Sequence, residues 1–283
     1  MIRILPQNVI NKIAAGEVVE RPASVVKELV ENALDAGASS IKVSIRGNAL
    51  GGIEVVDDGC GMGGQDASLC LEHHATSKIT AVGDLNAIGS FGFRGEALSS
   101  IAAVSRVTLI TRNAGSGTGL KLQAVAGEIS SREPAASVVG TRIRVEDLFF
   151  NVPARRKFLK SVRTEEALVA ETVRNMALTA PHVSFLFRKE GRDVLSLPAA
   201  EEKQRVEDIF KGKSLFFAEG REGGLALRAW LTLPEEARKG TGGLVLIVNR
   251  RVVADRAVAG AIAAGHEGLL DKGRYPMGAL FLE

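Results

Sequence analysis

The sequence of 283 residues has few cysteines, no long apolar run and no excess of charge of either sign. Its two cysteines, Cys60 and Cys70, are too few for a disulfide framework and fit a reducing cytoplasm. No apolar run approaches the roughly 20 residues that span a bilayer, and the first residues lack the apolar stretch of a signal peptide. Because 36 basic residues nearly balance 33 acidic ones, bulk charge does not indicate nucleic-acid binding. We therefore expect a globular cytoplasmic protein that has no membrane segment.

What the sequence does contain is a mixture of helical and strand periodicity, which predicts an α+β protein. Residues 24–35 place apolar side chains on one helical face, and Gly37 ends this helix. Residues 63–96 predict a helix followed by a long loop.

We predict two domains, residues 1–200 and 201–283. Because the sequence stops within an apolar strand, we expect the second domain to be truncated. Further helices are predicted at 97–103, 163–180, 205–210 and 256–264, and strands at 41–45, 53–56, 107–111, 119–124, 141–145, 183–188, 193–197, 225–233, 244–248 and 278–283.

Three polar residues share one stripe of the first helix. Glu28, Asn32 and Asp35 are spaced i, i+4 and i+7, opposite the apolar face. One interpretation is a solvated helix face. The other is a cleft, in which a carboxylate orients water as a general base and an amide oxygen helps to hold Mg²⁺.

A second motif, Asp57-x-Gly59-x-Gly61, follows the predicted strand at 53–56. Aspartate and glycine are common turn residues, so a plain turn is one interpretation. In the other, the Asp57 carboxylate accepts a hydrogen bond from an exocyclic amine such as that of adenine. Glycines beside it then let a flat ring approach the backbone.

The third motif is the glycine-rich stretch 89–98, which runs into the start of a helix. Loop amides followed by a helix start form a ready anion site. This stretch is not a Walker loop, because no Gly-Lys-Ser/Thr follows at the right spacing. Residues 75–78 add hydroxyls and a cation, although Phe91 and Phe93 equally suit a core.

In this order, the three motifs resemble those of the GHKL ATPases, a family that includes DNA gyrase, the large heat-shock chaperones and histidine kinases. Within that family the sequence is similar to the MutL-type mismatch-repair proteins. The runs at residues 92–98 and 151–159 argue against a topoisomerase subunit or a chaperone. The resemblance implies a GHKL (Bergerat) ATPase α/β sandwich followed by a second, smaller α+β domain. The matching runs are residues 13–22, 27–37, 74–79, 92–98 and 151–159.

The resemblance also implies a role for each matching residue. Glu28 corresponds to the general base for water attack, Asn32 to the Mg²⁺ ligand and Asp57 to the adenine contact. The other residues that it implies for ATP binding are Asp35, Gly61, Met62, Thr76, Ser77, Lys78, Gly92, Phe93, Arg94, Gly95, Glu96, Ala97, Leu98 and Thr141.

A conformational switch is implied as well. In the family, ATP orders a lid and an N-terminal segment, here roughly residues 2–20. Two N-terminal regions then pair, and hydrolysis resets the switch. A mismatch-recognition protein is the implied partner. The family's phosphate-contacting lysine, in a His-Pro-Ala-Lys-like loop, has no counterpart in this sequence. We therefore expect ATP to be bound better than it is hydrolysed.

An alternative to the switch is a nucleotide-binding DNA scaffold module with marginal hydrolysis. Its candidate contact is the densest basic stretch, residues 155–163. This stretch either contacts DNA phosphates, weakly and without sequence specificity, or is a solvated helix start.

Overall fold

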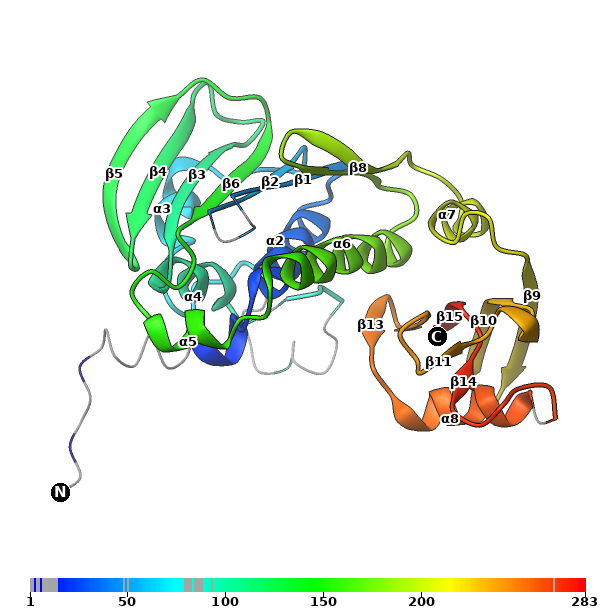
Figure 1. Ribbon diagram of the computed structural model, residues 1–283. Helices are drawn as coiled ribbons and strands as arrows, with labels where there is room; N and C mark the ends of the chain where they lie inside the picture. Colours follow the sequence, from blue (N-terminus) through cyan, green and yellow to red (C-terminus); the bar gives the residue numbers. More distant parts are fainter. Residues whose placement is uncertain are drawn as a thin grey trace. The chain divides into compact units, whose positions relative to one another are not determined.

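The computed structural model describes residues 3, 6, 15–47, 49, 51–78, 83, 89–92, 94–266 and 268–283. The chain divides into two compact units. The N-terminal unit comprises Met1–Val173 and Val183–Pro198, and the C-terminal unit comprises Arg174–His182 and Ala199–Glu283. Each unit combines helices with a mixed sheet (Figure 1), so the predicted α+β class is confirmed.

An eight-stranded sheet forms the N-terminal unit, in the order β5-β4-β3-β6-β2-β1-β7-β8. β1 and β7 run parallel, and every other neighbouring pair is antiparallel. Ile41, Val43 and Ile45 of β1 are buried while the residues between them are half-exposed, so one face of the sheet is the core face. The strands are β1 (Ser40–Arg46), β2 (Gly52–Asp57), β3 (Arg106–Arg112), β4 (Gly119–Val125), β5 (Glu128–Ala135), β6 (Gly140–Glu146), β7 (Ser184–Lys189) and β8 (Arg192–Leu197).

Helices α2 (Pro22–Asp35) and α4 (Ala97–Ala103) cover the core face of this sheet, and Figure 1 shows them on the same side. α2 begins with Pro22, whose missing amide donor is tolerated at a helix start, and it buries residues such as Val26 and Leu29. It ends at Asp35, and Gly37, two residues later, has the left-handed φ of +71° that is typical after a helix end. The other helices that begin in this unit are α3 (Gly64–Leu69), α5 (Pro153–Phe158) and α6 (Val162–Thr179).

The C-terminal unit has a five-stranded sheet with apolar clusters on both faces, in the order β13-β12-β15-β10-β9. Adjacent residues of β10 point to opposite faces. Trp230 packs with Val206 of α7 and Leu178 of α6, and Leu231 belongs to the cluster that contains Ala259 of α8. Among the described residues, no helix is long and apolar enough to cross a membrane. The elements of this unit are α7 (Glu202–Ile209), β9 (Leu215–Glu222), β10 (Leu225–Thr232), a 3-10 turn (Pro234–Glu236), β11 (Arg238–Lys239), β12 (Leu244–Val248), β13 (Arg251–Val253), α8 (Arg256–Gly265), β14 (Arg274–Tyr275) and β15 (Gly278–Leu282).

The structure contains elements that hydrophobic periodicity does not predict, and the longest of these are β5 and β9. Both are edge strands of their sheets, and most of their residues are exposed. An edge strand with little burial on either face has no alternating apolar pattern, and it tolerates a residue such as Pro134.

Candidate active site

The polar stripe of α2 is not a solvated face. The side chain of Asp35 is only 7% exposed and that of Glu28 is 24% exposed. Burial raises the pKa of the Glu28 carboxyl above its ordinary value. The positive charges of Lys27, Lys78 and Arg94 act in the opposite direction and do not cancel the effect of burial. The stripe is therefore partly desolvated, which a solvated helix face does not explain.

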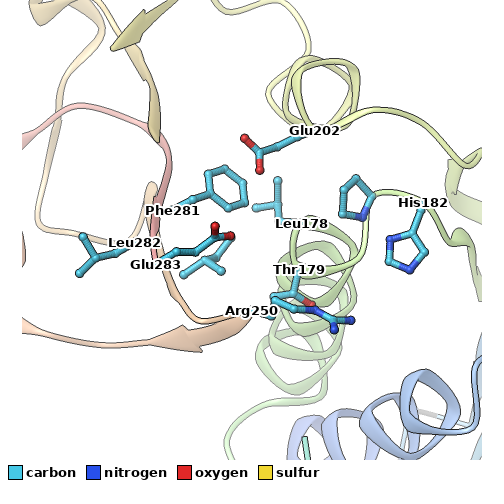
Figure 2. Close-up of a pocket in the computed structure, with 10 residues that line it drawn as sticks. Leu178, Thr179, His182, Glu202, Arg250, Phe281, Leu282 and Glu283 are labelled. Carbon is cyan, nitrogen blue, oxygen red and sulfur yellow. The ribbon is translucent and has the colours of Figure 1, made fainter. Parts of the chain in front are cut away.

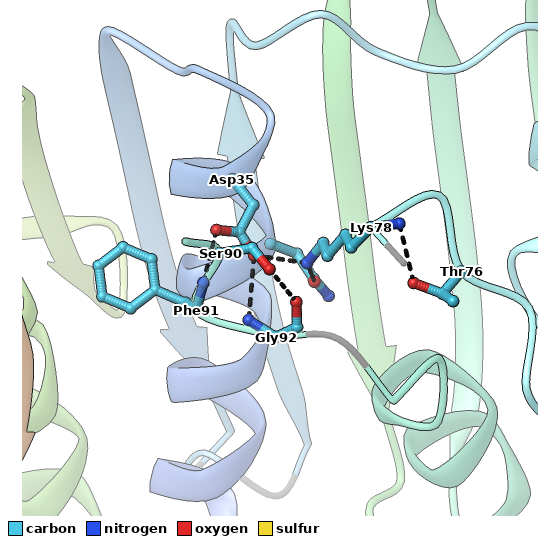
Figure 3. A network of polar contacts seen from close by, with 7 residues as sticks. Asp35, Thr76, Lys78, Ser90, Phe91 and Gly92 are labelled. Carbon is cyan, nitrogen blue, oxygen red and sulfur yellow. Dashed lines mark hydrogen bonds and ion pairs between the residues drawn. The ribbon is translucent and has the colours of Figure 1, made fainter. Parts of the chain in front are cut away.

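The Lys78 ammonium group joins the stripe to residues 76–78. It donates to Asn32 Oδ1 at 2.9 Å and to Asp35 Oδ2 at 2.5 Å (Figure 3). The Lys78 backbone amide in turn donates to Thr76 Oγ1 at 3.1 Å. An amide oxygen and a carboxylate oxygen of α2 thus converge on one positive charge.

The same carboxylate also binds the glycine-rich loop. The backbone amides of Phe91 and Gly92 donate to Asp35 Oδ1 and Oδ2 at 2.8 and 3.1 Å, and Ser90 Oγ donates to the Gly92 carbonyl at 2.7 Å (Figure 3). Asp35 is therefore the junction of three segments that are far apart in the sequence.

Asp57 lies at the end of β2 on the core face of the sheet. Its Oδ1 accepts a hydrogen bond from the Gly59 amide at 3.0 Å. Burial raises the pKa of Asp57 to about 6, although the amides of Gly59 and Thr141 stabilise its ionised form and so act in the opposite direction. Burial thus outweighs the stabilisation of the ionised carboxylate by its backbone donors.

The glycines near Asp57 are required by the packing of one backbone on another. Gly61 has a φ of +64°, and a Cβ there would lie 2.0 Å from the carbonyl oxygen of Arg112. A Cβ on Gly140 would lie 2.2 Å from the carbonyl oxygen of Asp57. The sequence interpretation explained Gly61 by the approach of a flat ring, whereas the structure supplies a nearer reason in chain packing.

The Asp57 motif is attached to the C-terminal end of α2. The Cys60 amide donates to the Ala36 carbonyl at 2.9 Å, and a Cβ on Gly59 would lie 2.8 Å from the Ala36 Cβ. Asp35, at the C-terminal end of α2, and the Lys78 that is bonded to it therefore lie in the same region as the Asp57 motif. Asn32 and Glu28 continue the stripe along α2 from that end.

The remaining predicted residues are distributed around this region. The His74 amide donates to the Gly95 carbonyl at 3.1 Å, and the side chains of His74 and Glu96 approach within 3.4 Å. Ala97 and Leu98 begin α4, and Ser77 is exposed. Phe93 lies outside the described residues.

Two residues that the sequence motifs do not single out as site residues hold the surroundings of Asp57 in place. Thr111 of β3 is fully buried, and its hydroxyl contacts Met62, Gly140 and Thr141. The Asp58 carboxylate turns away to the start of β1, where it accepts from the Ser39 and Ser40 amides, each at 2.8 Å. Desolvation acts to raise the pKa of Asp58, but the hydrogen bonds from Ser39 and Ser40 outweigh it and lower this pKa. Only the pairing register of β3 with β6 identifies Thr111, and that register is not visible in the sequence.

The donor set fits a cation that is bound mainly by other ligands. Among the described residues, no group of three or more His, Cys, Asp or Glu side chains could hold a metal ion. Asn32 and Asp35 nevertheless already coordinate the Lys78 ammonium through oxygen atoms. Mg²⁺ prefers oxygen ligands and commonly takes only one or two from the protein, with phosphates and waters supplying the rest.

A cavity of about 190 Å³ lies elsewhere, within the C-terminal unit (Figure 2). Leu178, Ile247 and Phe281 form its apolar wall, and Glu202 and Arg250 are among its polar lining residues. None of the residues predicted to bind nucleotide lines this cavity.

The fold and the site together place the N-terminal unit in the GHKL ATPase class. A family profile described as "Histidine kinase-, DNA gyrase B-, and HSP90-like ATPase" matches residues 20–147. A second profile, "DNA mismatch repair protein, C-terminal domain", matches residues 206–283. The whole chain is 46% identical to the DNA mismatch repair protein MutL of Trichlorobacter lovleyi and 44% identical to that of Geobacter sulfurreducens, covering 48% and 47% of those proteins. The chain belongs to the MutL family of DNA mismatch-repair proteins.

A solved structure supports the same assignment. The Aquifex aeolicus MutL ATPase domain complexed with ADP is 31% identical, with a TM-score of 0.71 over 94% of this chain and 92% of that one. The chain spans about half the length of the full MutL relatives that it matches.

Proposed function

We propose that this chain binds ATP with Mg²⁺ at the polar stripe of α2 and the adjoining Asp57 motif, and that it hydrolyses ATP slowly as a switch in mismatch repair. The observation that carries this proposal is the convergence of α2, the segment ending at Lys78 and the 90–92 loop on Asp35, beside the Asp57 motif. The family assignment and the ADP complex of the A. aeolicus domain support a nucleotide ligand.

In this proposal, Asp57 receives the exocyclic amine of adenine. Its ionised carboxylate can only accept hydrogen bonds, so it favours a ligand edge that donates. Gly61, Met62 and Thr141 lie around it and form the rest of the base contact.

Glu28 is the proposed general base, because it lies on the same helical stripe as Asn32 and its pKa is raised by burial. A carboxylate whose pKa is nearer to the working pH takes a proton from attacking water more readily. The positive charges of Lys78 and Arg94 act on Glu28, which supports a base close to the segments that are proposed to contact phosphates.

Asn32 is the proposed protein ligand of Mg²⁺, which would neutralise phosphate charge when bound. The Lys78 ammonium occupies the oxygen of Asn32 in this structure, so it must leave that oxygen before the metal can use it. A released Lys78, with Thr76, Ser77 and Arg94, is then available to the phosphates. The backbone amides of residues 92–98 complete the proposed phosphate contacts.

The switch itself is proposed from the family. The first described helical turn packs on the N-terminal unit, since Ala15 and Val19 are fully buried and the Arg155 guanidinium fills the space beside Gly16. Of the predicted N-terminal segment, roughly residues 2–20, most of residues 2–14 lie outside the described residues. We propose a self-association of two N-terminal units with ATP, a mismatch-recognition protein as partner and a cytoplasmic location, which two free cysteines support.

The test compares ATP turnover with binding of a non-hydrolysable ATP analogue. Glu28→Ala should bind the analogue and lose about 10²- to 10⁴-fold in turnover. Asn32→Ala should lose the Mg²⁺-dependent part of binding. Glu128→Ala, at an exposed carboxylate at the start of β5, is the matched control and should do neither. The wild type should sediment as a dimer with the analogue and as a monomer with ADP.

Different parts of the proposal would be contradicted by different results. Turnover by Glu28→Ala at the wild-type rate would exclude Glu28 as the base. A wild type that binds neither ATP nor ADP would overturn the proposal as a whole. Addition of a C-terminal stretch that carries the lysine motif should raise ATP turnover. Equal turnover with and without that stretch would exclude a role for the lysine in hydrolysis.

The DNA scaffold alternative is favoured by one specific observation. α5 presents Arg156 and Lys157 to solvent beside Phe158, whose exposed fraction is 85%. An exposed ring among basic residues is typical of surfaces that stack on unpaired bases and contact phosphates. If α5 binds DNA, Arg156→Ala with Lys157→Ala should weaken single-strand binding and flatten its dependence on salt, measured by fluorescence anisotropy.

A further inference from the structure

A row of three polar side chains crosses the sheet beside the proposed base contact. Asp57 of β2 lies directly opposite Thr141 of β6, and Thr141 lies directly opposite Thr111 of β3. Residues directly opposite in antiparallel strands point to the same face of a sheet. Ile53 and Val55 of β2, and Leu109 of β3, are buried on that face, so the row belongs to the helix-covered side.

The hydrogen bonds of Thr111 use its full capacity. Its Oγ1 lies 2.9 Å from the Met62 amide, 3.1 Å from the Gly140 carbonyl and 3.0 Å from Thr141 Oγ1. A hydroxyl has one donor and two acceptor lone pairs. The amide can only donate and the carbonyl can only accept, so Thr111 accepts from Met62 and gives its proton to Gly140.

This assignment fixes the direction of the third bond. Thr111 has no proton left for Thr141, so the Thr141 hydroxyl must donate to Thr111. The opposite direction would give up the bond from Thr111 to the Gly140 carbonyl, and buried polar groups in proteins are nearly always paired. Thr141 is thereby left with acceptor lone pairs only.

We infer that Thr111 is a positioning residue that makes Thr141 a hydrogen-bond acceptor beside Asp57, so that the pocket selects a 6-amino purine over a 6-oxo purine. The inference rests on the proposed nucleotide site. The ionised Asp57 carboxylate and the Thr141 hydroxyl then both require a donor from the ligand. The amino group supplies protons, whereas a 6-oxo group would place a third acceptor at the same position, where it can pair with neither Asp57 nor Thr141.

The experiment measures equilibrium binding of ADP and of inosine diphosphate, which differ at position 6 of the purine. The wild type should prefer ADP. Thr111→Ser keeps the hydroxyl and should keep the ratio of the two dissociation constants, whereas Thr111→Val should reduce that ratio on the order of tenfold. With ATP, Thr111→Val should raise KM and leave kcat unchanged. The substitution removes the hydrogen bond that orients the Thr141 hydroxyl, and that hydroxyl is proposed to contact the base and not the reacting phosphates.

The matched control is Thr108→Val. Thr108 lies on the same strand but on the opposite face of the sheet, so the same chemical change should leave the preference intact. Circular dichroism checks that each variant is folded. If Thr111→Val does not fold, Thr111→Cys repeats the measurement, because a thiol donates and accepts only weakly.

The outcomes separate this inference from the proposed function. A wild type that binds neither diphosphate overturns the nucleotide site itself. A wild type that binds both equally, or a folded Thr111→Val that keeps the full preference for ADP, overturns the role of Thr111 and leaves the nucleotide site in place. Loss of the preference in Thr111→Val, with retention in Thr111→Ser and Thr108→Val, supports it.

Discussion

Two acidic side chains of the N-terminal unit, Glu28 and Asp57, differ from two of the C-terminal unit in what sets their pKa. In the N-terminal unit, burial raises the pKa of Glu28 and of Asp57. In the C-terminal unit, hydrogen bonds from Lys213 and Arg228 lower the pKa of Glu236 and of Glu283. A carboxylate that its own fold leaves under-stabilised is available to a ligand, whereas one that is fully paired contributes to structure.

The two units also differ in how tightly the backbone packs around a glycine with positive φ. Disrupting the tight packing at Gly61 should have the largest effect on the free energy of unfolding. Gly61→Ala should destabilise the N-terminal unit by about 2–5 kcal/mol, because it combines a left-handed residue with a clash against the Arg112 carbonyl. Gly212→Ala, at φ +79° but in open space, should cost only about 1–2 kcal/mol. Urea denaturation followed by circular dichroism measures both. Equal losses would show that the packing around Gly61 is looser than the structure has it.

Asp57→Asn should have opposite effects on the free energy of unfolding, which should rise, and on the affinity for ADP, which should fall. Because the pKa of Asp57 is raised from 3.8 to about 6, the folded state is stabilised at low pH, and this contribution is lost as pH rises from about 4 through 6. At pH 8 the uncharged asparagine should therefore raise the free energy of unfolding by something on the order of 1–3 kcal/mol.

The same variant should bind ADP more weakly, since the charged acceptor is gone. Wild-type affinity for ADP should also fall as pH drops below about 6, where Asp57 becomes protonated. Unfolding curves and binding titrations at pH 5 and pH 8 measure these effects. A destabilised Asp57→Asn at pH 8 would contradict the assignment of burial as the dominant influence on this carboxyl.

The smallest effect is expected in the C-terminal unit. Arg228 bonds Glu202 at 3.1 Å and Glu283 at 3.0 Å, and these groups are partly exposed. Arg228→Met should therefore lower stability by less than about 1 kcal/mol, and salt should reduce the difference further. The fluorescence of Trp230, the one tryptophan of the sequence, follows this unit. ADP affinity should not change, and a change would mean that the C-terminal unit contributes to nucleotide binding.

Much of the architecture was predictable because periodicity and end signals are local. The helix predicted at 24–35 is α2, and Gly37 ends it as expected. The fold class and the family follow from short motifs and are confirmed. β5 and β9 were not predicted, because exposed edge strands have no apolar alternation.

The site was predictable as a set of residues but not as a set of contacts. Helical spacing predicted the stripe of Glu28, Asn32 and Asp35, and the structure shows Glu28 and Asp35 to be partly buried. The role of each residue toward nucleotide stays a prediction. The contact of Lys78 with Asn32 and the row that ends at Thr111 depend on tertiary pairing, which no local pattern encodes.

The contact of Lys78 with α2 has a consequence for how the binding reaction responds to solution conditions. Lys78 supplies Asp35 with a counterion from the chain itself, so binding of a metal–nucleotide complex there would exchange one positive charge for another. The net transfer of charge at α2 is therefore smaller than the acidic stripe alone would suggest. Nucleotide affinity should accordingly vary only gently with ionic strength, and it should vary more steeply once Lys78 is replaced by methionine.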